Sequence, residues 1–112
     1  MRLTDLSPKW WAAPGRVGQG VLFLCPHCEE TWLCVPFRNP LDGGAPWELS
    51  PSPRSLWEVI YPTYLPRGTT MVPPGHLWLR EGDDFDSLGL RPSVDASRAG
   101  CWHGFVRNGE VR

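Results

Sequence analysis

The sequence predicts a small, mostly β single domain with long loops rich in proline and glycine and with little helix. Twelve glycines and thirteen prolines among 112 residues exclude long helices, since a proline inside a helix costs about 3 kcal/mol. Short apolar runs bounded by glycine, proline and asparagine are typical of strands. Seven tryptophans indicate a compact fold, because such rings bury much apolar area. We therefore expect about five short strands around a modest core.

Turn residues divide this domain, residues 1–112, into four segments. Residues 1–19 are expected to form an irregular arm, and residues 20–44 a hairpin that carries a metal-binding turn. Residues 45–75 are interrupted by prolines and predict an inserted surface excursion. Residues 76–112 contain the C-terminal strands that complete the metal site.

The expected strands follow one another along the chain. The hairpin joins the apolar runs at 20–24 and 31–35, and residues 55–61 are a strand or a single helical turn. Further strands are predicted at 76–80, 88–94 and 101–106. Asn108-Gly109 is the favoured pair for a two-residue hairpin turn, so a very short returning strand is expected at the end of the sequence.

Cysteine and histidine residues from both halves of the chain predict one zinc site. Cys25 and Cys28 are three residues apart on a tight turn that contains Pro26. Cys101 and His103 are two residues apart, and on a strand such residues point to the same face, about 6.5 to 7 Å apart. Together they supply the four ligands of a tetrahedral Zn²⁺ ion. This ion would tie the two ends of the chain together.

Other roles for the cysteines stay open at this point. A single Cys-x-x-Cys pair also occurs as a redox motif, although the βαβ pattern expected around one is missing. Two disulfides would suit a secreted protein, but residues 1–14 contain no apolar signal segment. Cys34 is either a ligand in place of His103 or a small buried residue, and its neighbours Leu33 and Val35 favour burial.

Charge and hydropathy indicate which kinds of partner the protein binds. The formal net charge is −1, with 11 basic and 12 acidic residues and no basic block, so nucleic-acid binding is not expected. The sequence lacks the ~20 apolar residues that cross a bilayer. We expect a cytoplasmic protein whose partner or substrate is another protein or a small molecule.

Two C-terminal segments form a recognisable pattern: Leu-Gly-Leu-Arg-Pro-Ser-Val at 88–94 and Gly-Cys-Trp-His-Gly-Phe-Val-Arg-Asn-Gly-Glu-Val at 100–111. They resemble a bacterial and phage family known as domain of unknown function 6527. The run Val-Pro-Phe-Arg-Asn-Pro-Leu-Asp-Gly-Gly at 35–44 is similar to phage members. The resemblance covers residues 10–44 and 76–112. Some members occur beside genes for ubiquitin-like conjugation, which implies a peptidase that processes a ubiquitin-like or other protein tail, in the host cytoplasm if phage-encoded.

Ser93 and His103 are the candidate catalytic residues of such a peptidase. A serine hydroxyl needs an adjacent base, which here is His103 or His76, with Asp95 or Asp86 to orient the ring. His103 does not readily act both as a zinc ligand and as a base. In one resolution, Cys34 completes the zinc site and frees His103.

In a second resolution, the ion itself is catalytic. It would keep an open position for water, Ser93 would position the substrate, and Glu29 or Asp95 would serve as the base. Three thiolates would weaken its Lewis acidity, so the first resolution is favoured among the catalytic versions.

A non-enzymatic role is the alternative. The four ligands then close a structural zinc site, and Ser93 is a turn residue whose hydroxyl caps the backbone. Function would lie in an aromatic surface that binds a host or phage protein. The candidate aromatic residues are in the arm and in the excursion: Trp10, Trp11, Trp47, Trp57, Tyr61 and Tyr64. The same rings would otherwise form the core.

Overall fold

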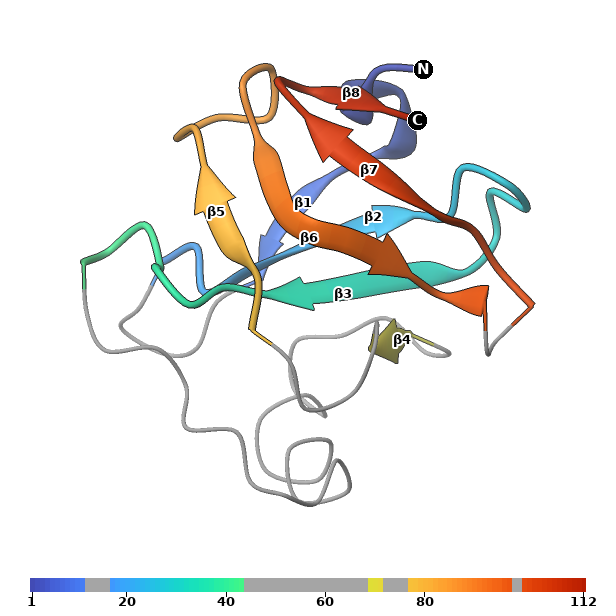
Figure 1. Cartoon of the computed structure of the whole chain (residues 1–112), viewed down its shortest axis with the longest axis horizontal. Coiled ribbons are helices and arrows are strands. Elements are labelled where there is room, and N and C mark those ends of the chain that lie inside the picture. The colour runs from blue at the N-terminus through green and yellow to red at the C-terminus, as the bar shows by residue number, and fades with distance from the viewer. Residues whose placement is uncertain (12–16, 44–68, 72–76, 98–99) are drawn as a thin grey trace.

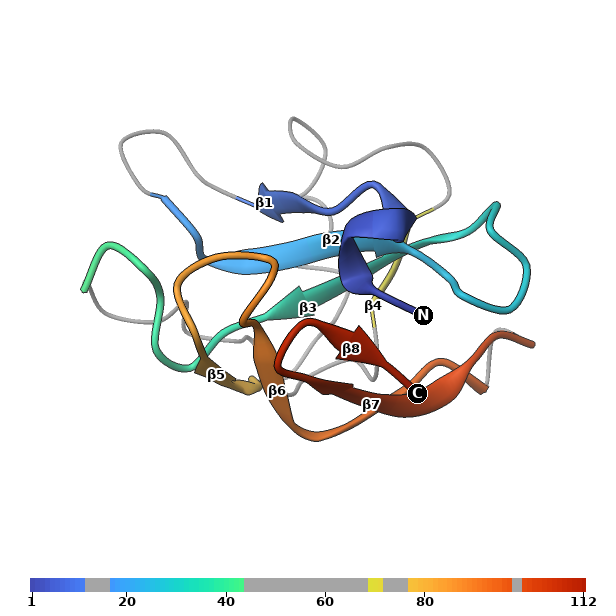
Figure 2. The ribbon, with the colours of Figure 1, turned by 90° about the horizontal axis from the view of Figure 1, so that it is seen from above.

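The computed structural model describes residues 1–11, 17–43, 69–71, 77–97 and 100–112. It confirms the mostly β class: eight strands form two four-stranded sheets, and the helical segment in this part of the chain is one short 3-10 turn. The two sheets lie as two layers (Figure 1, Figure 2). The many short strands agree with a chain interrupted throughout by glycine and proline.

The first sheet contains the predicted hairpin. Its strands are β1 (Lys9–Trp11), β2 (Gly20–Leu24), β3 (Trp32–Pro36) and β4 (Thr70–Met71), hydrogen-bonded in that order. Strands β1, β2 and β3 are antiparallel, whereas β4 runs parallel to β3. Residues on both faces of β2 and β3 are buried, which explains why these strands are continuous apolar runs instead of alternating ones.

The second sheet is an antiparallel meander. It consists of β5 (Leu79–Glu81), β6 (Gly89–Asp95), β7 (His103–Arg107) and β8 (Glu110–Val111). β7 alternates between exposed and buried residues, so one face of this sheet is open to solvent. The turn from β7 to β8 is the predicted Asn108-Gly109 pair, and both residues have positive φ, as a type I′ turn requires.

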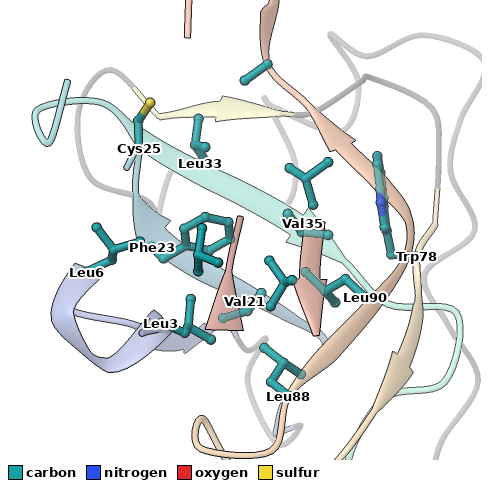
Figure 3. Packing of buried hydrophobic residues seen from close by; sticks show 14 of the residues in the cluster. Leu3, Leu6, Val21, Phe23, Cys25, Leu33, Val35, Trp78, Leu88 and Leu90 are labelled. Atoms are coloured by element: carbon teal, nitrogen blue, oxygen red, sulfur yellow. The ribbon is translucent and has the colours of Figure 1, made fainter. Parts of the chain in front are cut away.

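The core fills the space between the two sheets (Figure 3). Phe23 and Val35 enter it from the first sheet, and Leu90 and Val106 from the second. The 3-10 turn η1 (Leu3–Leu6) closes one side with its two buried leucines. Most of the free energy that holds the layers together therefore comes from apolar area removed from water, at about 25 cal/mol per Å².

The N-terminal segment is more ordered than the sequence analysis expected. In place of an irregular arm over residues 1–19, η1 and β1 are present, and β1 pairs with β2. Trp11 is 1% exposed, and Trp10 stacks on Phe85 with ring centroids 4.3 Å apart. These tryptophans belong to the packing, so the arm does not offer the aromatic binding surface proposed for it.

Other expectations differ by a few residues or lie outside the described ranges. The strand predicted at 76–80 begins at Leu79, and the one predicted at 101–106 begins at His103. The expected element at 55–61 and all of the excursion 45–75 except residues 69–71 lie outside the described residues.

The two ends of the chain lie side by side (Figure 1). The Leu3 N–H donates to the Gly109 carbonyl at 2.8 Å, and the Arg2 guanidinium pairs with Glu110 at 2.9 Å. In the described part of the molecule, no helix has the length and apolar character needed to cross a bilayer.

Candidate metal centre and the serine–histidine pair

Three of the predicted zinc ligands come together. The sulfur atoms of Cys25, Cys28 and Cys101 all lie within 4.8 Å of one another. Zn–S bonds of about 2.3 Å in a tetrahedral site put sulfurs about 3.8 Å apart, so a small contraction brings all three onto one ion. All four cysteines of the chain lie in the described ranges, and none is joined in a disulfide. This cluster can hold a metal ion.

The turn after β2 places the first two thiols. The Cys25 N–H donates to the Thr31 carbonyl at 2.8 Å, and the Glu29 N–H donates to the Cys25 carbonyl at 2.8 Å. Glu29 has a φ of 55°, in the left-handed region that non-glycine residues rarely adopt. Cys25 itself is buried at one end of the core (Figure 3). The turn therefore starts from a fixed point and folds Cys28 back beside it.

The backbone of this turn favours the charged form of Cys28. Hydrogen bonds from the Glu30 N–H, the Thr31 hydroxyl and the Thr31 N–H lower the pKa of the Cys28 thiol to about 6. A thiolate is the form that binds a metal ion, because the proton must leave before the sulfur coordinates. The turn thus prepares one ligand in its metal-binding state.

The loop between β6 and β7 places the third thiol. Backbone hydrogen bonds from Ala96 N–H to the Trp102 carbonyl and from Cys101 N–H to the Ala96 carbonyl close this loop. Gly100 has a φ of 73°, which glycine adopts without strain. Trp102 packs edge-on against Phe23 of β2, which fixes the loop beside the Cys25 turn. Burial raises the pKa of the Cys101 thiol, and the neighbouring thiols add to that shift, while a hydrogen bond with the Thr31 side chain opposes it.

His103 does not join the three sulfurs. The sequence analysis placed it beside Cys101 because residues two apart on a strand share a face. Cys101 precedes β7, however, and the alternation begins only at His103, which points to the exposed face of the sheet. Its partner there is Ser93, not the thiol cluster.

Cys34, the reserve ligand, also lies outside the cluster. It is fully buried in β3, as favoured from its apolar neighbours, and its Cα partner across the sheet is Leu22. Leu33 and Val35 on either side belong to the core between the sheets, so Cys34 faces the other side of the first sheet. The described part of the chain therefore supplies three thiols to the site.

Ser93 and His103 form a second constellation on the open face of the other sheet. The Ser93 Oγ and the His103 Nε2 are 3.1 Å apart, a hydrogen-bond distance. The antiparallel pairing of β6 with β7 produces this contact. Ser93 is half-buried and His103 is exposed, so the pair is accessible to solvent.

The structure separates the two aspartates that were candidates to orient His103. Asp95 is the Cα partner of His103 in the sheet, and its Oδ1 accepts hydrogen bonds from the Ser97 N–H and hydroxyl. Asp86 lies at the other end of β6, paired with Arg2. Asp95 is thus the acid near His103. The alternative base, His76, lies outside the described residues.

Sequence reasoning missed the groups that support the cluster. Thr31 and the Glu30 N–H act on the cysteines through hydrogen bonds, and nothing in their residue types marks them. It also missed two exposed arginines, Arg107 and Arg112. The alternation of the predicted last strand could have predicted that Arg107 is exposed. Val106 faces the core, so its neighbours on the strand face the solvent.

The fold and the site define a small two-sheet β protein with a cluster of three thiols that could hold a metal ion. Comparison of the chain with protein-family models, curated proteins and solved structures finds no match.

Proposed function

We propose that this chain is a zinc-binding, peptidase-like hydrolase of phage or bacterial origin. In this proposal the ion is structural, and Ser93 and His103 carry out the chemistry. The observation that carries it is the 3.1 Å contact between the Ser93 hydroxyl and the His103 ring, on a face open to a substrate. A histidine at this distance is placed to accept the serine proton.

Zinc suits the cluster because thiolate ligands select it over harder cations such as Mg²⁺. When bound by Cys25, Cys28 and Cys101, it supplies a cross-link between the β2–β3 turn and the start of β7. Three thiolates donate much negative charge and weaken the Lewis acidity of the ion. This favours a structural role for the ion and leaves the reaction to the serine–histidine pair.

The residues of the pair act in a fixed order in this proposal. Ser93 Oγ attacks the carbonyl carbon of the substrate while His103 Nε2 takes the hydroxyl proton. His103 then gives that proton to the leaving amine, and water releases the acyl group from Ser93. Asp95, opposite His103 in the sheet, is positioned to stabilise the charged ring. The resemblance of residues 88–94 and 100–111 to a family near ubiquitin-like conjugation genes points to a protein tail as substrate.

The test is the Ser93→Ala variant with a fusion of a ubiquitin-like modifier as substrate. We expect cleavage to fall by about 10³-fold or more, with zinc content and melting temperature unchanged. Ser87→Ala is the matched control. The Ser87 hydroxyl donates a hydrogen bond to Asp84 in the β5–β6 connection, so this variant should cleave the fusion at the wild-type rate. Cleavage at the wild-type rate by Ser93→Ala would contradict the proposal.

A second candidate is a non-enzymatic protein that binds a host or phage protein. The observation in its favour is the exposure of two large apolar residues on the second sheet, Phe105 at 46% and Leu79 at 45%. For this function, Ser93→Ala should leave partner binding unchanged, while deletion of residues 45–75 or the Phe105→Ala change should weaken it.

A further inference from the structure

The outer face of β7 and of the segment that follows it carries side chains for which the proposed chemistry has no role. Phe105 and Arg107 alternate with core residues on β7. The backbones of Phe105 and Arg112 exchange two hydrogen bonds of 2.9 Å, so Arg112 lies directly opposite Phe105, on the same face. Together with Asn108 and Glu110, these three residues line a pocket of about 530 Å³.

This pocket has an excess of positive charge. Within the described residues, neither Arg107 nor Arg112 forms an ion pair. The acidic residue of the lining, Glu110, is paired with two cations, the Arg2 guanidinium at 2.9 Å and the Met1 amino group at 3.8 Å. The Arg107 guanidinium lies 4.9 Å from the centre of the Phe105 ring, a cation–π contact that keeps the charge beside an apolar surface.

The pocket is in line with the serine–histidine pair. His103, Phe105 and Arg107 are successive outward-facing residues of β7. A strand rises about 3.3 Å per residue, so Arg107 is roughly 13 Å from His103, and Phe105 is halfway between them. About four residues of an extended peptide span that distance.

We propose that this pocket is a subsite for a carboxylate of the polypeptide substrate. An apolar side chain of the substrate packs on Phe105, and Arg107 and Arg112 bind an acidic group about four residues from the bond that Ser93 attacks. Guanidinium groups match carboxylates through paired hydrogen bonds, which a neutral amide cannot accept from two donors with the same geometry and charge. As a substrate subsite, the pocket rests on the proposed hydrolase function.

A polypeptide carboxylate fits this face better than a nucleic acid does. The chain has a net charge of −1, and the acidic residues Glu110 and Glu81 line this pocket and the hollow beside it, next to Arg107. A phosphate backbone needs a row of unpaired cations, whereas Arg91 and Arg2 on this side of the molecule are paired with Glu81 and Glu110.

The experiment measures peptide binding by the full-length Ser93→Ala protein, which does not consume the probe. The probe is a fluorescein-labelled hexapeptide, Gly-Gly-Ala-Leu-Ala-Glu with an amidated end, in which leucine and glutamate are two residues apart and so point to the same side of an extended chain. Its match has glutamine in place of glutamate. We expect the glutamate peptide to bind about tenfold more tightly than the glutamine peptide, with a difference that shrinks at high salt.

Variants of the pocket complete the test. When Arg107→Gln or Arg112→Gln is added to the Ser93→Ala protein, its affinity for the glutamate peptide should fall to its affinity for the glutamine peptide. Arg38→Gln, an exposed arginine just after β3, is the matched control and should bind like the parent. Three results would each overturn the subsite. They are equal binding of the two peptides, equal losses of binding in all three arginine variants, and preferential binding of a labelled ten-nucleotide DNA strand.

The subsite and the hydrolase proposal fail in different ways. If Ser93→Ala cleaves the modifier fusion normally while the peptide results hold, the catalytic proposal is wrong and the binding pocket stands. If cleavage depends on Ser93 but the protein with both arginines intact binds and cleaves acidic and neutral substrates alike, the subsite alone is wrong.

Discussion

Cys28 lies where three hydrogen-bond donors meet its sulfur, and these donors, from Glu30 and Thr31, lower the pKa of its thiol to about 6. Cys34, by contrast, is buried among strands and takes no part in the cluster. The two cysteines therefore differ in function although both are near the same hairpin.

A pair of substitutions tests this difference at the residue scale. Cys28→Ser should reduce bound zinc from about one equivalent to nearly none, because a hydroxyl does not replace a thiolate ligand. Cys34→Ala should keep its zinc, even if the small cavity lowers the melting temperature. Elemental analysis of the purified proteins measures both results. Loss of zinc from Cys34→Ala with retention by Cys28→Ser would reverse the assignment.

Glu29 offers a test of the turn itself. Its φ of 55° disfavours a side chain, so Glu29→Gly should stabilise the protein by roughly 0.5 to 1 kcal/mol in denaturant unfolding. Glu30→Gly, at a neighbour without positive φ, is the control and should be neutral or destabilising. Greater destabilisation by Glu29→Gly than by Glu30→Gly would show that the left-handed turn is not a feature of the folded state.

At the scale of elements, the last strand shows what sequence patterns predict and what they do not. The existence of the strand and its Asn108-Gly109 turn follow from local signals, whereas its pairing with the segment of Ser93 is seen only in the structure. The position of its first residue does not, because tertiary packing of Trp102 on Phe23 decides where the loop ends. That difference of two residues moves His103 from the zinc ligands to Ser93.

The β7–β8 turn also connects three elements that are far apart in the sequence. The Gly109 carbonyl accepts from Leu3, and its N–H donates to the Leu88 carbonyl at 2.9 Å. Gly109 has a φ of 75°, and a Cβ there would overlap the Asp86 carbonyl. A side chain at this position would push the turn away from Leu3 and Leu88, the two residues whose backbones bond to Gly109.

Gly109→Ala should therefore destabilise the fold by about 1 to 3 kcal/mol, measured by chemical denaturation. Gly89→Ala is the matched control, since a Cβ at Gly89 meets only ordinary contacts of 3.6 Å or more. Its effect should stay within about 1 kcal/mol. Equal stabilities of the two variants would mean that the close approach at Gly109 is not maintained.

On the scale of the whole molecule, the thiol cluster joins the two sheets at one end. Cys25 and Cys28 follow β2 of the first sheet, and Cys101 precedes β7 of the second. The sequence predicted this long-range link from the number and spacing of the cysteine and histidine residues, which match the four ligands of a tetrahedral zinc ion. It did not predict how the two sheets stack, since short apolar strands do not encode which faces meet.

Removal of the ion should weaken the whole fold. For a ligand present at 100 times its dissociation constant, the stabilisation lost is about 2.7 kcal/mol, which lowers the melting temperature on the order of 10 °C. We expect this drop when a strong chelator is added to the wild-type protein, and no drop for Cys28→Ser. An unchanged melting temperature of the wild-type protein after addition of the chelator would argue against a structural ion.

X-ray absorption of the zinc-loaded protein is the most direct measurement of the shared site. Three sulfur ligands at about 2.3 Å and one nitrogen or oxygen ligand are expected from Cys25, Cys28 and Cys101 together. Four sulfur ligands would require Cys34, and fewer than three would leave Cys101 apart from the turn, so either spectrum would contradict an ion held by these three thiols.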